Sequence, residues 1–248
     1  MTFSHTELDE LRSIIQSADN IVFFGGAGVS TESNIPDFRS EQGLYNAKNK
    51  YGYSPEYMLS HSFFEQYPEQ FYNYYLGELT YKDALPNAAH YALAKLEQQG
   101  KLRAVITQNI DGLHQKAGSQ NVLELHGSVS RNYCMNCGVH YSLDFMLEHS
   151  NSVPHCLDCG GIVRPDVVLY EESLDMHIMK AAQKAIEECQ VLIVGGTSLV
   201  VYPAAGLLHY FHGDKLVLIN KTATDFDRRA DLVIHDSIGR ALNYATED

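Results

Sequence analysis

Two hydrophobic patterns alternate along this chain. Short runs of consecutive apolar residues predict strands that are buried on both faces, because a strand with one exposed face alternates apolar and polar residues. Such runs occupy residues 21–24, 104–107, 122–125, 191–194, 216–220 and 232–235. Apolar residues at three- and four-residue spacing predict amphipathic helices over residues 4–18, 87–99, 174–189 and 203–212. The alternation indicates an α/β fold, with a Rossmann-like parallel sheet covered by helices on both faces.

Residues 40–85 interrupt this alternation and are rich in aromatic side chains. They hold nine of the 16 tyrosines and three of the ten phenylalanines. Part of this set follows the spacing of one helix face, namely Phe63, Phe64, Tyr67, Phe71, Tyr72 and Tyr75. We interpret the segment as a small helical module with an aromatic core, and the alternative that some rings line a ligand channel stays open.

Four of the five cysteines form two CxxC pairs with 18 residues between them, Cys134 with Cys137 and Cys156 with Cys159. This spacing is typical of a four-thiolate zinc ribbon. Four thiolates complete the tetrahedron around one zinc ion and leave no position for water or substrate, so we expect a structural metal. We expect the fifth cysteine, Cys189, to be a buried apolar side chain at the end of a helix.

A length of 248 residues fits one large domain with a small insert. We assign residues 1–39, 86–127 and 166–248 to the Rossmann-like domain. The small inserted domain then consists of the helical module, 40–85, and the zinc-ribbon module, 128–165.

The chain carries 31 acidic and 18 basic side chains, a net charge of −13. Nucleic-acid binding depends on clustered cations, so we expect no nucleic acid as the main ligand, although an acidic rim could steer basic partners. The first residues lack the basic and apolar regions of a secretion signal, and no apolar run approaches the roughly 18 residues of a spanning helix. We therefore expect a cytoplasmic monomer without a membrane segment.

Small and polar residues follow three of the predicted strands. Gly26-Ala-Gly28 would let the backbone approach a phosphate, although Thr31 stands where hydride-transferring dehydrogenases carry a third glycine. Gly195-Gly-Thr-Ser198 and Asn220 follow two further strands. Because the carboxyl ends of parallel strands meet in one crevice, these residues predict a ligand with phosphates and ribose hydroxyls.

Several sequence motifs follow one another along residues 20–236. They are Gly26-Ala-Gly-Val-Ser-Thr-Glu-Ser-Asn-Ile-Pro-Asp-Phe-Arg39, Thr107-Gln-Asn-Ile-Asp-Gly-Leu-His114, His126-Gly127, the four cysteines, Arg164-Pro-Asp-Val-Val168 and Gly196-Thr-Ser-Leu-Val-Val-Tyr-Pro203. With these motifs the chain resembles the sirtuins, NAD-dependent protein deacylases, and most of all their bacterial members. The resemblance implies transfer of the acetyl group from acetyl-lysine to ADP-ribose. The products would be nicotinamide, deacetylated lysine and 2′-O-acetyl-ADP-ribose, with NAD as a consumed cosubstrate.

The resemblance also implies roles for individual residues. His126 matches the general base that deprotonates a ribose hydroxyl, a task that suits an imidazole at neutral pH. Asn109 matches a catalytic residue that organises the ribose, and Asp111 matches the residue that binds the nicotinamide carboxamide. Gln108 and Ile110 lie beside them in the cofactor site.

Two more groups of cofactor residues follow from the resemblance. Phe38 would shield the reacting carbon from water and Arg39 would face phosphate. Ala27 and Thr31 belong to the same cofactor-binding loop. The adenosine half would be held by Thr197, Ser198, Asn220, Lys221 and Asp236.

Sirtuins bind their peptide substrate as an added strand, here between residues 167–172 and 199–202, through backbone hydrogen bonds that are largely blind to sequence. The implied substrate-binding residues are Val167, Val168, Tyr170 and Val200, and the implied partners are acetylated proteins or peptides.

Three departures from the family pattern change the expectations. Asn34 replaces a common glycine, and asparagine tolerates the left-handed conformation. Tyr170-Glu-Glu172 replaces the usual Phe-Gly-Glu of the substrate segment, which could alter peptide binding. Tyr75 stands where succinyl-removing members carry the arginine of Tyr-x-x-Arg, so we predict a preference for acetyl and other neutral acyl groups.

Two alternative functions stay open at this point. One is mono-ADP-ribosyl transfer to a protein, and the other is a non-catalytic sensor of NAD or acyl-lysine. The presence of His126 and of the complete Gln108–Asp111 run favours deacetylation over both.

Overall fold

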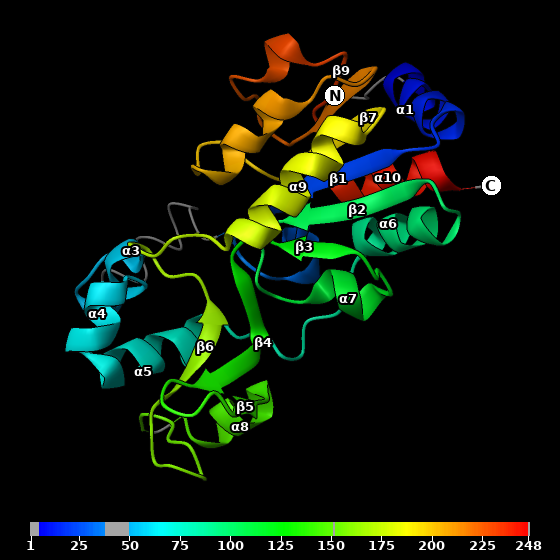
Figure 1. The fold of residues 1–248 in the computed structure, drawn as a ribbon. Coiled ribbons are helices and arrows are strands. Elements are labelled where there is room, and N and C mark those ends of the chain that lie inside the picture. Colours follow the sequence, from blue (N-terminus) through cyan, green and yellow to red (C-terminus); the bar gives the residue numbers. More distant parts are fainter. Residues whose placement is uncertain (1–4, 38–49, 151, 248) are drawn as a thin grey trace.

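The computed structural model describes residues 5–37, 50–150 and 152–247, and the ribbon divides into a larger and a smaller part (Figure 1). The predicted positions Phe38 and Arg39 lie outside the described residues. The larger part contains a six-stranded sheet and the smaller part a three-stranded sheet with several helices.

The six-stranded sheet confirms the predicted parallel arrangement. Its strands are β1 (Ile21–Gly25), β2 (Leu102–Thr107), β3 (Val122–Glu124), β7 (Val191–Gly195), β8 (Lys215–Ile219) and β9 (Leu232–Ile234). They lie in the order β3-β2-β1-β7-β8-β9, and each neighbouring pair is parallel. Every residue of β1 and β7 is buried, as their unbroken apolar runs predict. The order reverses direction between β1 and β7, and ligands bind at such switch points in open α/β sheets.

Helices cover both faces of this sheet. One apolar core joins the sheet to α1 (His5–Ser17), α6 (Ala88–Gln98) and α10 (Ile238–Thr246), and a second joins it to α9 (Met176–Glu188) and the 3-10 helix η3 (Ala204–Tyr210). The segment predicted as a helix over 203–212 therefore winds more tightly than an α-helix. Gly206 near its centre disfavours a regular α-helix.

Short elements complete the larger part. They are η1 (Ala27–Val29), η2 (Thr31–Ser33), α7 (Leu113–Ala117) and η4 (Asp227–Arg229). Asn34 ends η2 with φ 61°, so the asparagine does adopt the left-handed conformation expected of it.

The smaller part unites the two inserted modules around one core. Its antiparallel sheet has the order β5-β4-β6, from β4 (Gly127–Cys134), β5 (His140–Tyr141) and β6 (Val163–Val167). Its helices are α3 (Pro55–Met58), α4 (His61–Gln66), α5 (Pro68–Glu78) and α8 (Leu143–Glu148). Phe64 and Phe71 pack with Met146 and Val163, so the aromatic helix face and the cysteine-bearing segment share a core. The boundaries assigned at 127/128 and 165/166 fall within β4 and β6.

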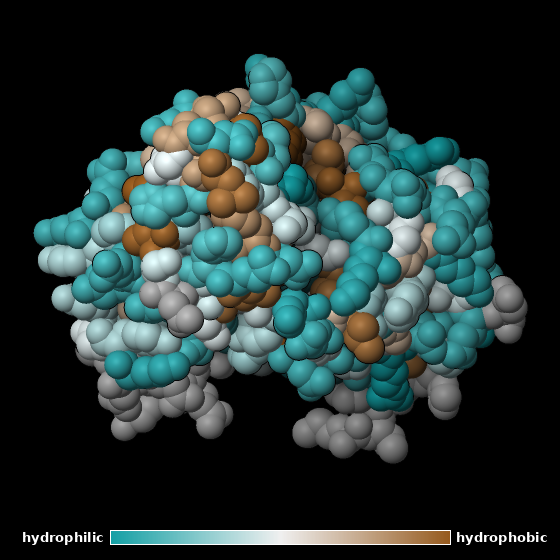
Figure 2. All heavy atoms as spheres, turned by 90° about the horizontal axis from the view of Figure 1, so that it is seen from below, coloured by the Kyte–Doolittle hydropathy of each residue, from teal (hydrophilic) through white to brown (hydrophobic). Residues whose placement is uncertain are grey.

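Polar residues dominate the face of the molecule that is seen from below, where apolar residues form separate patches (Figure 2). Among the described residues, no helix combines the length and the apolar character needed to cross a bilayer.

Candidate functional site

A cavity of about 1030 Å³ opens where the carboxyl ends of β1, β2 and β7 face the smaller part. Many of the residues predicted from the sequence lie in its wall. They are Ala27, Gln108, Asn109, Ile110, Asp111, His126, Val167, Val168, Tyr170, Thr197, Ser198 and Val200. Thr31, Asn220, Lys221 and Asp236 are not part of that wall. The crevice expected from the strand pattern thus contains the predicted central residues.

Close packing of two glycine turns forms the floor of the cavity. The N–H of Gly28 donates to the carbonyl oxygen of Gly196 over 2.8 Å. A Cβ atom built on Gly28 would lie 2.6 Å from the Cα of Gly196, so only glycine fits there. The turns after β1 and β7 can therefore meet at the switch point of the sheet.

A buried hydroxyl connects two of the predicted polar residues. The Oγ of Ser30 donates to Oδ2 of Asp111 over 2.7 Å and accepts a hydrogen bond of 3.0 Å from Nδ2 of Asn109. The other oxygen of Asp111 accepts from the N–H of Leu113 at 2.9 Å. Both side chains are thereby held in one orientation. Sequence reasoning missed Ser30, whose only signal was a hydroxyl group within the glycine-rich turn.

Gln108 and Thr197 lie against each other on the adjacent wall. The Nε2 of Gln108 donates to Oγ1 of Thr197 over 3.1 Å, and the N–H of Thr197 donates to Oδ1 of Asn220 over 3.0 Å. Asn220 thus supports the wall from behind. Its Nδ2 is buried without a hydrogen-bond partner among the described residues, which fits a site that still has a polar ligand group to receive.

His126 has a defined tautomer. Its Nδ1 lies 2.8 Å from the carbonyl oxygen of Gln108, so Nδ1 carries the proton and donates, and Nε2 has a free lone pair. Burial lowers the pKa of His126, and the hydrogen bond to Gln108 raises it by a smaller amount. The imidazole is therefore neutral at pH 7 and able to accept a proton at Nε2.

The backbone geometry at Gly127 explains why a glycine follows His126. Its φ is +75°, and a Cβ atom there would lie 2.0 Å from the carbonyl oxygen of Asp166. The chain turns sharply at this glycine from β3 into β4. The turn places the histidine at the junction of the two parts of the molecule.

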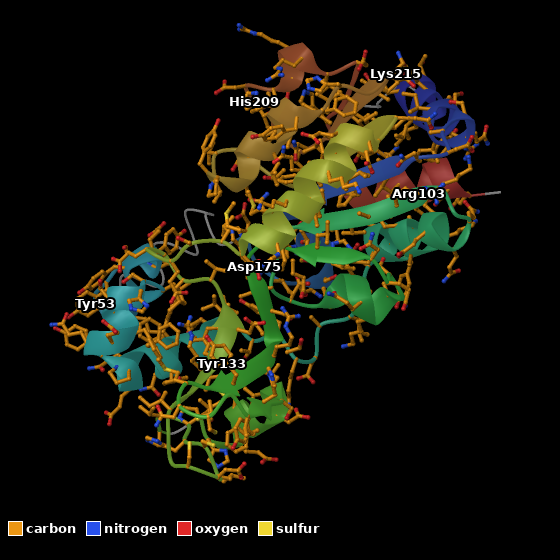
Figure 3. The ribbon with its side chains drawn as sticks, in the orientation of Figure 1. Tyr53, Arg103, Tyr133, Asp175, His209 and Lys215 are labelled. Carbon is orange, nitrogen blue, oxygen red and sulfur yellow. The ribbon has the colours of Figure 1, made fainter. Side chains whose placement is uncertain are left out.

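The predicted substrate segment begins beside the histidine. The N–H of Val168 donates to the carbonyl oxygen of His126 over 3.0 Å. Val200 lies in the wall that leads from β7 and is exposed. Asp175, labelled in Figure 3, caps the start of α9 where the chain leaves the smaller part.

The model of the Sir2 family matches residues 26–203 of this chain. The chain belongs to the Sir2 family. An NAD-dependent protein deacetylase of Clostridium acetobutylicum is 62% identical over 236 residues, which cover 95% of this chain and 96% of that protein. A protein of the same description from Cutibacterium acnes is 53% identical and covers 95% of this chain and 96% of its own length.

Solved Sir2 structures share the whole fold. One described as "Structural Basis for the Mechanism and Regulation of Sir2 Enzymes" has a TM-score of 0.86 and 38% identity, covering 98% of this chain and 97% of the other. Another, "Sir2-p53 peptide-NAD+", has a TM-score of 0.82 and 38% identity, covering 97% and 96%. The Sir2 fold therefore extends over both parts of this molecule.

The four predicted zinc ligands of this Sir2 chain lie together. The Sγ atoms of Cys134, Cys137, Cys156 and Cys159 all lie within 4.8 Å of one another, and two pairs are 3.5 and 3.6 Å apart. Tetrahedral Zn–S bonds of about 2.3 Å place sulfur atoms roughly 3.8 Å apart, so the cluster fits one structural zinc ion. Cys189 is buried elsewhere, and its thiol donates to a helix carbonyl, as expected.

The aromatic residues of the helical module form a core, as interpreted from the sequence, and a ligand channel lined by some of its rings stays a hypothesis. Tyr72 is a core residue whose hydroxyl donates to the carbonyl oxygen of Val163 over 2.7 Å. Tyr75 is fully buried in the same core and also contributes to the cavity wall, which Lys50 and Glu78 line as well. Those two charged side chains form an ion pair with each other. Sequence reasoning missed this pair, because nothing in the spacing of residues 50 and 78 relates them.

Proposed function

We propose that His126 is the general base in the deacetylation of protein lysine side chains by this chain. As a member of the Sir2 family the chain is an NAD-dependent protein deacetylase. It transfers the acetyl group to ADP-ribose and releases nicotinamide, deacetylated lysine and 2′-O-acetyl-ADP-ribose.

The hydrogen bond between His126 and the carbonyl oxygen of Gln108 carries the proposal. It holds the proton on Nδ1 and leaves Nε2 as the acceptor, inside a cavity that also contains Asn109 and Asp111. A neutral imidazole so oriented can take a proton from a ribose hydroxyl. General-base catalysis of this kind contributes roughly 10²–10⁴-fold in rate.

The other polar residues orient the cosubstrate. NAD, when bound, supplies the ribose carbon that the acetyl oxygen attacks as nicotinamide leaves. Asn109 and Asp111 are held by Ser30 so that an amide and a carboxylate face the ribose and the nicotinamide carboxamide. Thr197 and Ser198 approach the adenosine half, with Asn220 supporting Thr197.

Several further assignments to the cosubstrate site are predictions from family resemblance. They are Ala27, Thr31, Phe38, Arg39, Gln108, Ile110, Lys221 and Asp236.

Acetylated peptides would bind as an added strand between Val167–Tyr170 and Val200. Backbone recognition of this kind implies broad sequence selectivity. We also propose that the chain acts as a cytoplasmic monomer. We further propose that nucleic acid is not its main ligand, because its net charge of −13 repels the dense negative charge of a nucleic-acid backbone.

The test is His126→Ala, with the exposed His177→Ala as a matched control. Nicotinamide release and the mass of an acetyl-lysine peptide are followed together. We expect His126→Ala to lose at least about 100-fold in deacetylation rate while it stays folded and binds NAD, and His177→Ala to keep full activity.

Each other outcome points to a different function. Unchanged turnover of His126→Ala would refute the role of this histidine. A gain of ADP-ribose mass on the peptide would indicate mono-ADP-ribosyl transfer. NAD binding without nicotinamide release by the wild-type protein would indicate a sensor.

A further inference from the structure

The segment after β6, residues 168–172, lies against α4 although the two are about a hundred residues apart in sequence. Figure 1 shows the chain between β6 and α9 passing beside the cyan helices of the smaller part. The N–H of Tyr170 donates to the carbonyl oxygen of Leu59 over 2.9 Å, and the N–H of His61 donates to that of Tyr170 over 3.0 Å. Backbone pairing thus brings the segment to the start of α4.

Glu172 anchors this segment from the inner side. Its carboxylate accepts hydrogen bonds of 2.9 and 3.0 Å from both terminal nitrogens of Arg164 and one of 2.9 Å from the N–H of Leu169. It also lies 2.9 Å from Nδ1 of His61. Burial by itself raises the pKa of Glu172, but these donors lower it below its usual value. The segment therefore closes into a tight turn around a charged side chain.

Glu171 is one of two residues by which this segment departs from the sirtuin pattern, and it replaces the glycine. Its φ is +76°, a conformation that favours glycine, and the family pattern has glycine here. The side chain that replaces glycine has a defined function in the fold. Its Oε2 accepts hydrogen bonds from the N–H of Ser62 over 2.9 Å and from Oγ of Ser62 over 2.6 Å. These bonds lower the pKa of Glu171.

We propose that Glu171 is a positioning residue that ties the peptide-binding segment to α4, so that this edge is formed before substrate arrives. The inference rests on the proposed function, because it assumes that residues 167–170 bind the peptide. At its other end the segment is bonded to the carbonyl oxygen of His126 through Val168. The tie and this bond thus hold the two ends of the peptide-binding segment.

The chemistry favours a rigid segment over a flexible one. A backbone edge that is already held in place loses less conformational entropy when a peptide strand pairs with it. Loss of the tie should therefore weaken peptide binding. It should leave the reaction of bound substrate almost unchanged, because the carboxylate of Glu171 is bonded to Ser62 and the bond of Val168 to His126 is kept.

The experiment compares Glu171→Ala and Glu171→Gly with Glu69→Ala, a control that removes an exposed carboxylate from α5. We expect faster amide hydrogen exchange of residues 168–172 in both Glu171 variants. We also expect a rise of roughly three- to tenfold in KM for an acetyl-lysine peptide, the size that loss of one or two hydrogen bonds produces. The values of kcat and of KM for NAD should stay within about twofold, because only ground-state binding is lost.

A second variant isolates the hydrogen bonds. Ser62→Ala removes the hydroxyl donor but keeps the backbone N–H, so its effect on KM should be smaller than that of Glu171→Ala. In the Glu171→Ala background, Ser62→Ala should add nothing, because both substitutions break the same tie.

Unchanged exchange, or an unchanged KM for the peptide, would overturn the proposal. A lower melting temperature with unaltered KM would also overturn it, because the tie would then serve stability alone. If the wild-type protein failed to deacetylate the peptide, the proposed function would be refuted independently of the role of Glu171. Exchange and calorimetric peptide affinity of the same variants would still decide whether Glu171 positions the segment.

Discussion

Two buried histidines, one in α6 and one in α7, should make this protein less stable in acid. His90 of α6 and His114 of α7 have ring centroids 4.7 Å apart and are almost completely inaccessible to solvent. Nδ1 of His90 accepts from the N–H of Asn87, whereas neither ring nitrogen of His114 has a partner among the described residues. Burial lowers the pKa of His114 to about 3, with His90 as a second cause. Burial also lowers the pKa of His90, which the charge of Asp111 partly opposes.

The sign of the effect follows from proton binding. Below pH 6.5 the unfolded chain protonates these histidines and the folded chain does not, so the free energy of unfolding falls as pH falls. Between pH 7.5 and pH 5.0 one such histidine should cost about 2 kcal/mol of stability. The size depends little on the folded pKa, as long as that pKa lies well below 5.

The perturbation is the substitution His114→Leu, because leucine has a similar volume and does not titrate. Urea unfolding is followed by far-UV circular dichroism at pH 7.5 and 5.0, since the chain has no tryptophan. We expect wild type to lose about 2 kcal/mol more than His114→Leu over this interval, and the exposed His177→Gln to behave as wild type. Carboxylates and zinc thiolates titrate in all three proteins, so their contributions cancel in the difference.

One result would refute this reasoning. If wild type and His114→Leu lost the same stability between pH 7.5 and 5.0, His114 would titrate equally in the folded and unfolded states. Its burial would then impose no penalty on its charged form.

Three shorter predictions concern the metal, the acyl group and the charge. Cys156→Ser removes one of four thiolates, so elemental analysis should show nearly no zinc in place of one ion per chain. The control Cys189→Ser should retain one zinc ion per chain. One zinc ion per chain in Cys156→Ser would contradict the assignment. The kcat/KM for acetyl-lysine peptides should exceed that for succinyl-lysine by about tenfold or more, since position 75 carries no arginine, and Lys50, which lines the same cavity, is already neutralised by its ion pair with Glu78. Tyr75→Arg should narrow that ratio, and a wild-type preference for succinyl would reject the reasoning. Raising the salt concentration from about 0.05 to about 0.5 M should lower kcat/KM for a basic acetylated peptide but not for a neutral one. If kcat/KM stayed constant for both peptides, the net charge would have no role in substrate capture.

Local patterns in the sequence were sufficient for most of the fold. The apolar runs that predicted β1 and β7 are buried throughout, because a strand covered on both faces consists mainly of apolar residues. The helix expected over 203–212 forms a 3-10 helix instead, and α10 was not predicted at all. Both are short segments whose form depends on what they pack against.

The candidate site also combines features that the sequence alone predicts with features that only the structure shows. The cysteine spacing identified the zinc cluster, since the geometry of each CxxC turn is local. The motifs pointed to His126 and Asp111 but not to Ser30. The hydroxyl of Ser30 bonds to both Asp111 and Asn109, which lie 81 and 79 residues from it in the sequence. The roles of Phe38 and Arg39 stay predictions, because both lie outside the described residues.

By itself, the sequence determined the parallel sheet, the metal-binding cysteines and the family of the chain. These depend on periodicity and short spacing, which the order of residues contains directly. Only the tertiary structure decided which nitrogen of His126 is free and where the carboxylate of Glu171 binds. Each of these is set by hydrogen bonds to a residue that is not a neighbour in the sequence, Gln108 for His126 and Ser62 for Glu171, and such contacts form only when the chain has folded.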